Sequence, residues 1–107
     1  MQNASLIVSI VRKGWGITAL EASVKAGARG GTVIAGRGAG INEQEKIFGM
    51  AIEPEKEILL TLTYSDRADA ILRAIVEAAE LNETGKGIAF VLPVDKVLGV
   101  AHFMTQG

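Results

Sequence analysis

The chain has 107 residues, 49% of them apolar, and a formal net charge of −1, so its length fits one domain with one core. It has no cysteine, which excludes disulfides, thiolate metal sites and a cysteine nucleophile. It has no basic cluster that would favour binding to nucleic acid. It also has no long apolar run that would indicate a membrane span and no leader-like start that would indicate secretion, so we expect a cytoplasmic protein.

The first predicted unit is a strand followed by a helix. Residues 5–12 are expected to form a strand, because aliphatic and mostly β-branched residues follow one another there almost without interruption. Residues 18–21 resemble a capping box, and Gly27 is placed to end the helix that this box starts. Three aliphatic residues share one face of this helix: Ile17, Leu20 and Val24.

A hairpin and a second helix are expected next. Residues 31–37 and 56–64 should pair as a long hairpin. In the second segment, Ile58, Leu60, Leu62 and Tyr64 alternate with Glu57, Leu59, Thr61 and Thr63, which is the two-residue period of a strand. Asp66 can cap the second helix, whose apolar stripe has 3.6-residue spacing: Ala68, Ile71, Leu72, Ile75, Val76 and Ala79. Residues 87–93 are a fourth strand, and residues 94–103 are a tail that could add an edge strand.

The predicted order βαββαβ is that of the ferredoxin-like fold, an α+β class with an antiparallel sheet and two helices on one face. A single domain over residues 1–107 accommodates it. The connection 38–55 interrupts this plan, and a connection of this length in a compact domain is usually functional. We expect it to be a regulatory loop in which residues 42–45 cap one helical turn. This turn would present three apolar residues to a partner: Ile47, Phe48 and Met50.

Two glycine-rich segments carry the candidate ligand site. The run 36–40 has three glycines in five residues, which weakens a strand unless a bulge or a closely approaching ligand requires them. The second segment, residues 84–87, precedes the last strand. Glycines let backbone N–H groups approach a ligand closely, an arrangement that suits a phosphate-bearing molecule.

Three stretches of the chain resemble the P-II nitrogen-regulatory family or its P-II-like branch. They are Gly31-Thr32-Val33, Arg37-Gly38-Ala39-Gly40 and Phe90-Val91-Leu92-Pro93-Val94. The last of them is the most specific. The large loop between the second and third strands of the family corresponds to residues 38–55.

This resemblance implies a homotrimer that binds an adenine nucleotide (ATP, ADP or AMP) in each cleft between subunits. One side of the site would consist of Thr32, Arg37, Gly38 and Gly40. The other side would consist of Thr84, Gly85, Lys86 and Gly87. The loop would dock on a regulated partner such as a membrane transporter. Because residues 38–55 contain no Ser, Thr or Tyr, modification of a hydroxyl in this loop is excluded.

Other classes of function have less support. The chain shows no nucleophile beside a base, so we do not expect an enzyme or a cofactor. His102 has no second histidine or cysteine as a metal partner, and we predict no metal site. Two alternatives stay open: a trimer that binds divalent cations, like the CutA family, and an oligomerisation module without a ligand. Trp15 is expected to pack over the sheet edge or at a subunit contact, or else to contact a ligand or partner.

Overall fold

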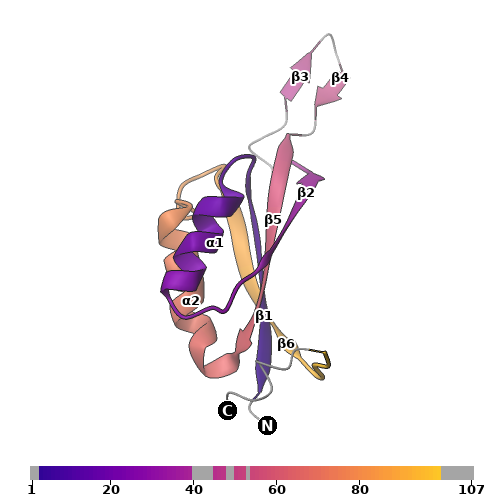
Figure 1. Ribbon diagram of the computed structural model, residues 1–107. Coiled ribbons are helices and arrows are strands. Elements are labelled where there is room, and N and C mark those ends of the chain that lie inside the picture. The colour runs from indigo at the N-terminus through magenta and orange to yellow at the C-terminus, as the bar shows by residue number, and fades with distance from the viewer. Residues whose placement is uncertain (1–2, 40–44, 48–49, 53, 100–107) are drawn as a thin grey trace.

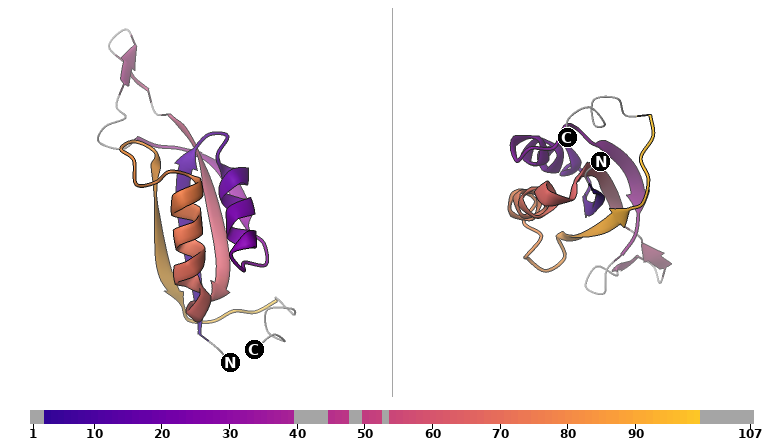
Figure 2. Two further views of the ribbon diagram at one scale, coloured as in Figure 1. Left: turned by 90° about the vertical axis from the view of Figure 1, so that its left-hand side faces the viewer. Right: turned by 90° about the horizontal axis from the view of Figure 1, so that it is seen from below.

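Two helices cover one face of a four-stranded antiparallel sheet in the computed structural model of the chain (Figure 1, Figure 2). The structure describes residues 3–39, 45–47, 50–52 and 54–99. The elements in chain order are β1 (Ala4–Arg12), α1 (Gly16–Lys25), β2 (Thr32–Arg37), β3 (Glu45–Ile47), β4 (Met50–Ile52), β5 (Glu55–Tyr64), α2 (Ser65–Ala78) and β6 (Gly87–Val94). The sheet order is β2-β5-β1-β6, which confirms the ferredoxin-like α+β fold.

The core lies between the sheet and the two helices. Ile7 of β1 and Leu59 of β5 point to this side, where they meet Ala19 of α1 and the α2 residues Ile71 and Ile75. None of these five side chains is exposed. Each fully buried large aliphatic side chain contributes about 1.5–3 kcal/mol, so the stripe predicted for the second helix holds the layers together.

The opposite face of the sheet is also apolar, and no helix of the described residues covers it. The strand register aligns one aliphatic residue from each strand in a row across this face: Ile34, Ile58, Ile10 and Ile88. Phe90 and Leu92 of β6 extend the apolar surface and are 39% and 44% exposed. The hairpin predicted from residues 31–37 and 56–64 is confirmed by the antiparallel pairing of β2 with β5.

Helix α1 begins earlier than the sequence predicted, and of the three aliphatic residues expected on its inner face only Leu20 packs against the core. It starts at Gly16 with Trp15 as the N-cap residue, so the capping box at residues 18–21 is wrong. Ile17 and Val24 are 58% and 47% exposed, whereas the buried positions are small: Gly16, Ala19 and Ser23. The reason is a close approach, since a Cβ on Gly16 would lie 2.6 Å from a Glu57 oxygen. Gly27, with φ +117°, follows the helix as predicted.

Helix α2 follows β5 without a loop, and Tyr64 is its N-cap residue. Asp66 lies inside the first turn and makes no side-chain capping bond, so the predicted cap is wrong. The start of the helix is held from β1 instead: the Ser65 N–H donates to the Asn3 carbonyl at 2.9 Å, and the hydroxyls of Ser5 and Ser65 are 2.7 Å apart. No helix of the described residues is long and apolar enough to cross a membrane.

The connection between β2 and β5 contains a ribbon of two short strands, β3 and β4, paired antiparallel. Ile47 ends β3 and Met50 begins β4, and the two residues are register partners, so the predicted helical turn is wrong for these positions. A ribbon pairs backbone groups across its strands, whereas one isolated helical turn is costly to nucleate. Phe48 and residues 42–44 lie outside the described residues. Figure 1 shows the ribbon beyond the end of the main sheet.

The segment after β6 does not form the edge strand considered for residues 94–103, as far as the structure describes it. Residues 95–99 contain no strand, and residues 100–103 lie outside the described residues. Val97 is 8% exposed and packs with Ala4 and Tyr64 in a small second cluster. This contact fixes the chain at the end of the sheet away from the ribbon.

Candidate functional site

The first candidate motif lies where β2 ends and the connection 38–55 begins. Arg37 is the last residue of β2 and is the register partner of Glu55. The Gly38 N–H donates to the carbonyl of Pro54 at 3.1 Å, which closes the base of the loop. Thr32 begins β2 five residues earlier, about 17 Å away along an extended strand. Gly40 lies outside the described residues.

The second candidate motif is the turn that leads from α2 into β6. The Lys86 N–H donates to the carbonyl of Glu83 at 3.3 Å, and Gly85 and Gly87 have φ values of +80° and +138°. A Cβ on Gly87 would overlap the carbonyl oxygen of Ile10. This glycine is therefore required by backbone packing, whatever its role toward a ligand.

The two motifs lie at the same end of the sheet but on opposite edges. One row of register partners crosses the sheet from Ala35 through Glu57 and Val11 to Gly87. The edges are three strand spacings apart, or about 14 Å. Thus the structure places Arg37 and Gly38 at one edge and does not bring them to residues 84–87 within one chain.

A cavity of about 430 Å³ lies beside Arg37 at this end of the sheet. It is lined by Lys13, Ala35, Gly36, Arg37, Glu55, Lys56 and Glu57. Three of these side chains are cationic and two are carboxylates, so the cavity can hold a small anion with neutralising groups on several sides. Among the cations only Arg37 was predicted from the sequence. The hairpin register, which sets Glu55 opposite Arg37, is the signal that could have identified Glu55.

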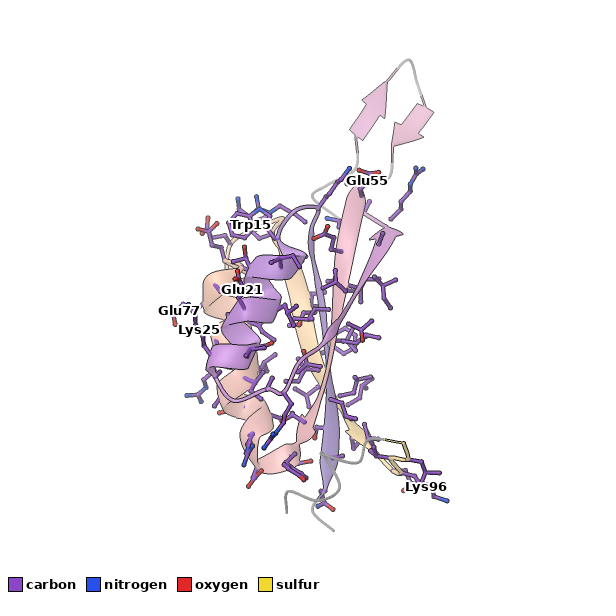
Figure 3. The ribbon with its side chains drawn as sticks, in the orientation of Figure 1. Trp15, Glu21, Lys25, Glu55, Glu77 and Lys96 are labelled. Carbon is purple, nitrogen blue, oxygen red and sulfur yellow. The ribbon has the colours of Figure 1, made fainter. Side chains whose placement is uncertain are left out.

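An ion pair lies at the rim of the cavity. The Lys13 Nζ is 2.7 Å from the Glu55 Oε2. The hydrogen bond and the opposite charge raise the pKa of Lys13 and lower the pKa of Glu55, and the charge of Arg37 lowers the pKa of Glu55 further. Both groups are therefore ionised around neutral pH. Figure 3 shows Glu55 at the end of β5 nearest the ribbon.

The second carboxylate, Glu57, is bonded to the start of helix α1. Its Oε1 accepts a hydrogen bond of 2.7 Å from the Gly16 N–H. A carboxylate at a helix N-terminus satisfies a free backbone donor and is favoured by the helix dipole. Because this contact joins residues 41 positions apart in the chain, local sequence patterns could not reveal it.

Trp15 is in contact with Arg12 at the junction of β1 and α1. The Arg12 guanidinium lies 4.4 Å from the centre of the Trp15 ring, and its Nη2 is 3.8 Å from the Glu80 Oε1. Figure 3 shows Trp15 on the helix side of the molecule. This contact lies beside β1, an interior strand of the sheet, so packing of Trp15 over a sheet edge is not what the structure shows, and a subunit, ligand or partner contact stays a prediction.

Comparison with known proteins agrees with the fold. Residues 4–102 match the model of a family described as nitrogen regulatory protein P-II. The chain belongs to the P-II family. The P-II chain is similar to a crystal structure of Arabidopsis thaliana PII bound to citrate, with a TM-score of 0.72 and 27% identity over 95% of this chain and 87% of that one. No curated protein sequence matched it significantly. As a family member it is a signal transduction protein.

Proposed function

We propose that three copies of this P-II protein assemble through the open face of the sheet. Monomeric proteins rarely expose large continuous apolar patches, and the row from Ile34 to Ile88 with Phe90 and Leu92 forms such a patch. A homotrimer is typical of the family. Assembly would cover this face and bring an edge of one subunit to an edge of the next.

The ligand of this trimer is a small anionic metabolite, an adenine nucleotide, bound between subunits. The observation that carries this proposal is the division of the candidate residues between two sheet edges at one end of the sheet. Arg37 and Gly38 of one subunit would face residues 84–87 of another. Thr32 lies about 17 Å along β2 from Arg37, which favours an elongated ligand over a compact one. The similar structure with bound citrate supports a small anion.

The ribbon connection passes the ligand state to a partner. It begins at Gly38 and returns at Glu55, and both residues lie beside the cavity or its rim. A ligand shifts the loop between conformations only by as much as its affinity differs between them. The regulated partner is a protein that binds the ribbon, and a membrane transporter is the class that the family resemblance implies.

Calorimetric titration with ATP, ADP, AMP, a cyclic dinucleotide and citrate tests the ligand. We expect one nucleotide site per subunit. Arg37→Ala should weaken it about tenfold or more, since a charge-assisted hydrogen bond contributes about 1.5–3 kcal/mol. Arg73→Ala is the matched control, because Arg73 pairs with Asp69 on the exposed surface of α2. Equal affinities of the two variants would contradict the assignment of Arg37.

Native mass spectrometry tests the trimer with a second matched pair. Leu92 on the open sheet face and Val24 on the outer face of α1 have similar exposed fractions, 44% and 47%. Leu92→Glu should yield monomers, because a charge cannot be buried unpaired in an apolar interface, and Val24→Glu should stay trimeric. A trimeric Leu92→Glu variant would show that another surface joins the subunits.

Neither the cation-binding trimer like the CutA family nor the oligomerisation module without a ligand is favoured by a specific observation. The described residues contain no group of three His, Asp or Glu side chains that could hold a metal ion. His102 lies outside the described residues. Titration with Cu²⁺ and Zn²⁺ alongside the nucleotides separates the cation-binding alternative from the nucleotide sensor.

A further inference from the structure

Two carboxylates of β5 hold the same turn between β1 and α1. Glu55 and Glu57 are two residues apart and therefore point to the same side of the strand. Glu57 accepts a hydrogen bond from the Gly16 N–H, and Glu55 pairs with the Lys13 side chain, both at 2.7 Å. The turn from Lys13 to Gly16 is thus tied to the start of β5 at both of its ends.

The two ties differ in how easily a ligand can replace them. Glu57 binds a backbone N–H of a buried glycine at a helix start, where no mobile group competes. Lys13 and Glu55 have side chains that are 68% and 52% exposed. Exposed ion pairs contribute little to stability because solvent screens them, so a second anion can compete for Lys13 at little cost.

The Glu55 carboxylate already occupies a position that an anionic ligand would take. It is paired with Lys13, and its register partner on the neighbouring strand β2 is Arg37, whose charge also acts on it. All three side chains line the same cavity, with Lys56 beside them. An anion that enters this cavity meets two cations whose charge is partly neutralised by Glu55.

We propose that Lys13 is a further ligand for the anion and that Glu55 is an internal carboxylate which the anion displaces. This inference rests on the proposed function. It adds Lys13 to the ligand site and gives a route by which anion binding changes the base of the ribbon connection. When the anion takes Lys13, the start of β5 loses its side-chain tie to the β1–α1 turn. Pro54 precedes Glu55 and accepts the Gly38 N–H, so the change reaches the base of the ribbon connection directly.

Amide hydrogen exchange of the trimer without ligand tests the tie itself. Glu55→Gln keeps the size of the side chain and removes its charge. In this variant the Gly38 N–H should exchange about two- to fivefold faster than in the wild type, because loss of an exposed ion pair changes an opening equilibrium by a factor of this size. Glu21→Gln removes one charge from the exposed outer face of α1 and should leave that rate unchanged. Equal rates in the two variants would overturn the coupling.

Calorimetric titration with ATP tests the competition. Glu55→Gln should bind ATP about two- to fivefold more tightly than the wild type, and Lys13→Met should bind it more weakly. In the Lys13→Met background, the increase in ATP affinity caused by Glu55→Gln should be smaller, because Glu55 no longer competes with ATP for the Lys13 ammonium group.

The outcomes of this titration separate the two proposals. Wild-type binding with no gain in Glu55→Gln, or a gain of the same size in the Lys13→Met background, would overturn the displacement and leave the nucleotide site intact. No binding of ATP by any variant would overturn the proposed nucleotide site and the competition together. The exchange measurement, which needs no ligand, would then still decide whether Glu55 holds the loop base.

Discussion

Replacing Thr61 with valine should make the protein more stable. Thr61 lies on the helix-facing side of β5 opposite Ile7, its exposed fraction is 0%, and its Oγ1 has no hydrogen-bond partner among the described residues. A buried hydroxyl without a partner is unfavourable by about 1–3 kcal/mol. Valine keeps the branched shape and suits a strand equally well. We therefore expect Thr61→Val to raise the free energy of unfolding by about 1–2 kcal/mol.

Urea denaturation, followed by circular dichroism at a fixed protein concentration, measures this gain. The concentration is fixed because the proposed assembly would stabilise the folded state by mass action. In a thermal scan the same change corresponds to a Tm higher by about 4–8 °C per kcal/mol for a domain near this size. Thr61→Ser is the control at the same site, since it keeps the hydroxyl and removes a buried methyl group, and it should lose about 1 kcal/mol.

A second control separates an unpaired hydroxyl from a paired one. Ser23 is equally buried, but its Oγ donates to the Leu20 carbonyl at 2.6 Å. Ser23→Ala should therefore gain nothing beyond the helix propensity of alanine, about 0.5 kcal/mol. A loss of stability in Thr61→Val with the fold intact would refute the reasoning, because it would mean that the hydroxyl has a partner such as a buried water.

Three further predictions concern the turns and ties around the site. Gly87→Ala should destabilise the protein by about 2–4 kcal/mol, because a Cβ with φ +138° overlaps the backbone of β1; wild-type stability in urea would contradict this. Glu57→Ala removes the cap of α1 and should lower the unfolding free energy by about 1 kcal/mol, whereas the exposed control Glu83→Ala should be neutral in the same assay. NMR titration should find the carboxyl of Glu55 ionising below its ordinary pKa of 4.5, and Lys13→Met should shift that pKa upward; an unchanged value would mean that the ion pair does not form in solution.

The sign of that last effect defines the pH range in which the pair exists. Because the pKa of Glu55 is lowered in the folded state, its contribution to folding stability is present above the ordinary pKa of 4.5. This contribution is lost as the pH falls through the folded-state pKa. The pKa of Lys13 is raised, so its contribution is present below the ordinary value of 10.5 and is lost as the pH rises through the folded pKa. The tie at the loop base therefore holds across the neutral range.

The accuracy of the sequence-based predictions follows from the size of the side chains at each contact. Ile71 and Ile75 are large, lie on one helical face and are fully buried, so their periodicity identified α2 correctly. Helix α1 buries Gly16, Ala19 and Ser23, so a pattern based on large apolar residues identified only Leu20 of its inner face and added two exposed residues, Ile17 and Val24. The small residues at spacings of three and four were the usable signal.

The candidate site was only partly predictable, because most of it depends on contacts distant in sequence. Arg37 and Gly38 belong to a glycine-rich run, residues 36–40, that is evident from the sequence. Their role in binding stays a prediction. Lys13 enters the cavity only because β1 lies next to β5 in the sheet. Glu57 reaches Gly16 only because α1 packs on the same strand. Neither contact has a local pattern.

Under the proposed function, the division of the candidate motifs between two sheet edges is also the reason that binding requires several copies of the chain. The two candidate motifs lie about 14 Å apart in one chain, and each would contribute to a different cleft of the proposed trimer. A ligand held between Arg37 of one subunit and residues 84–87 of another would bind only after assembly, and its binding free energy would be added to that of the proposed trimer. The open apolar face and the proposed anion site would then be two parts of one equilibrium, in which the ligand stabilises the assembly and the assembly completes the site.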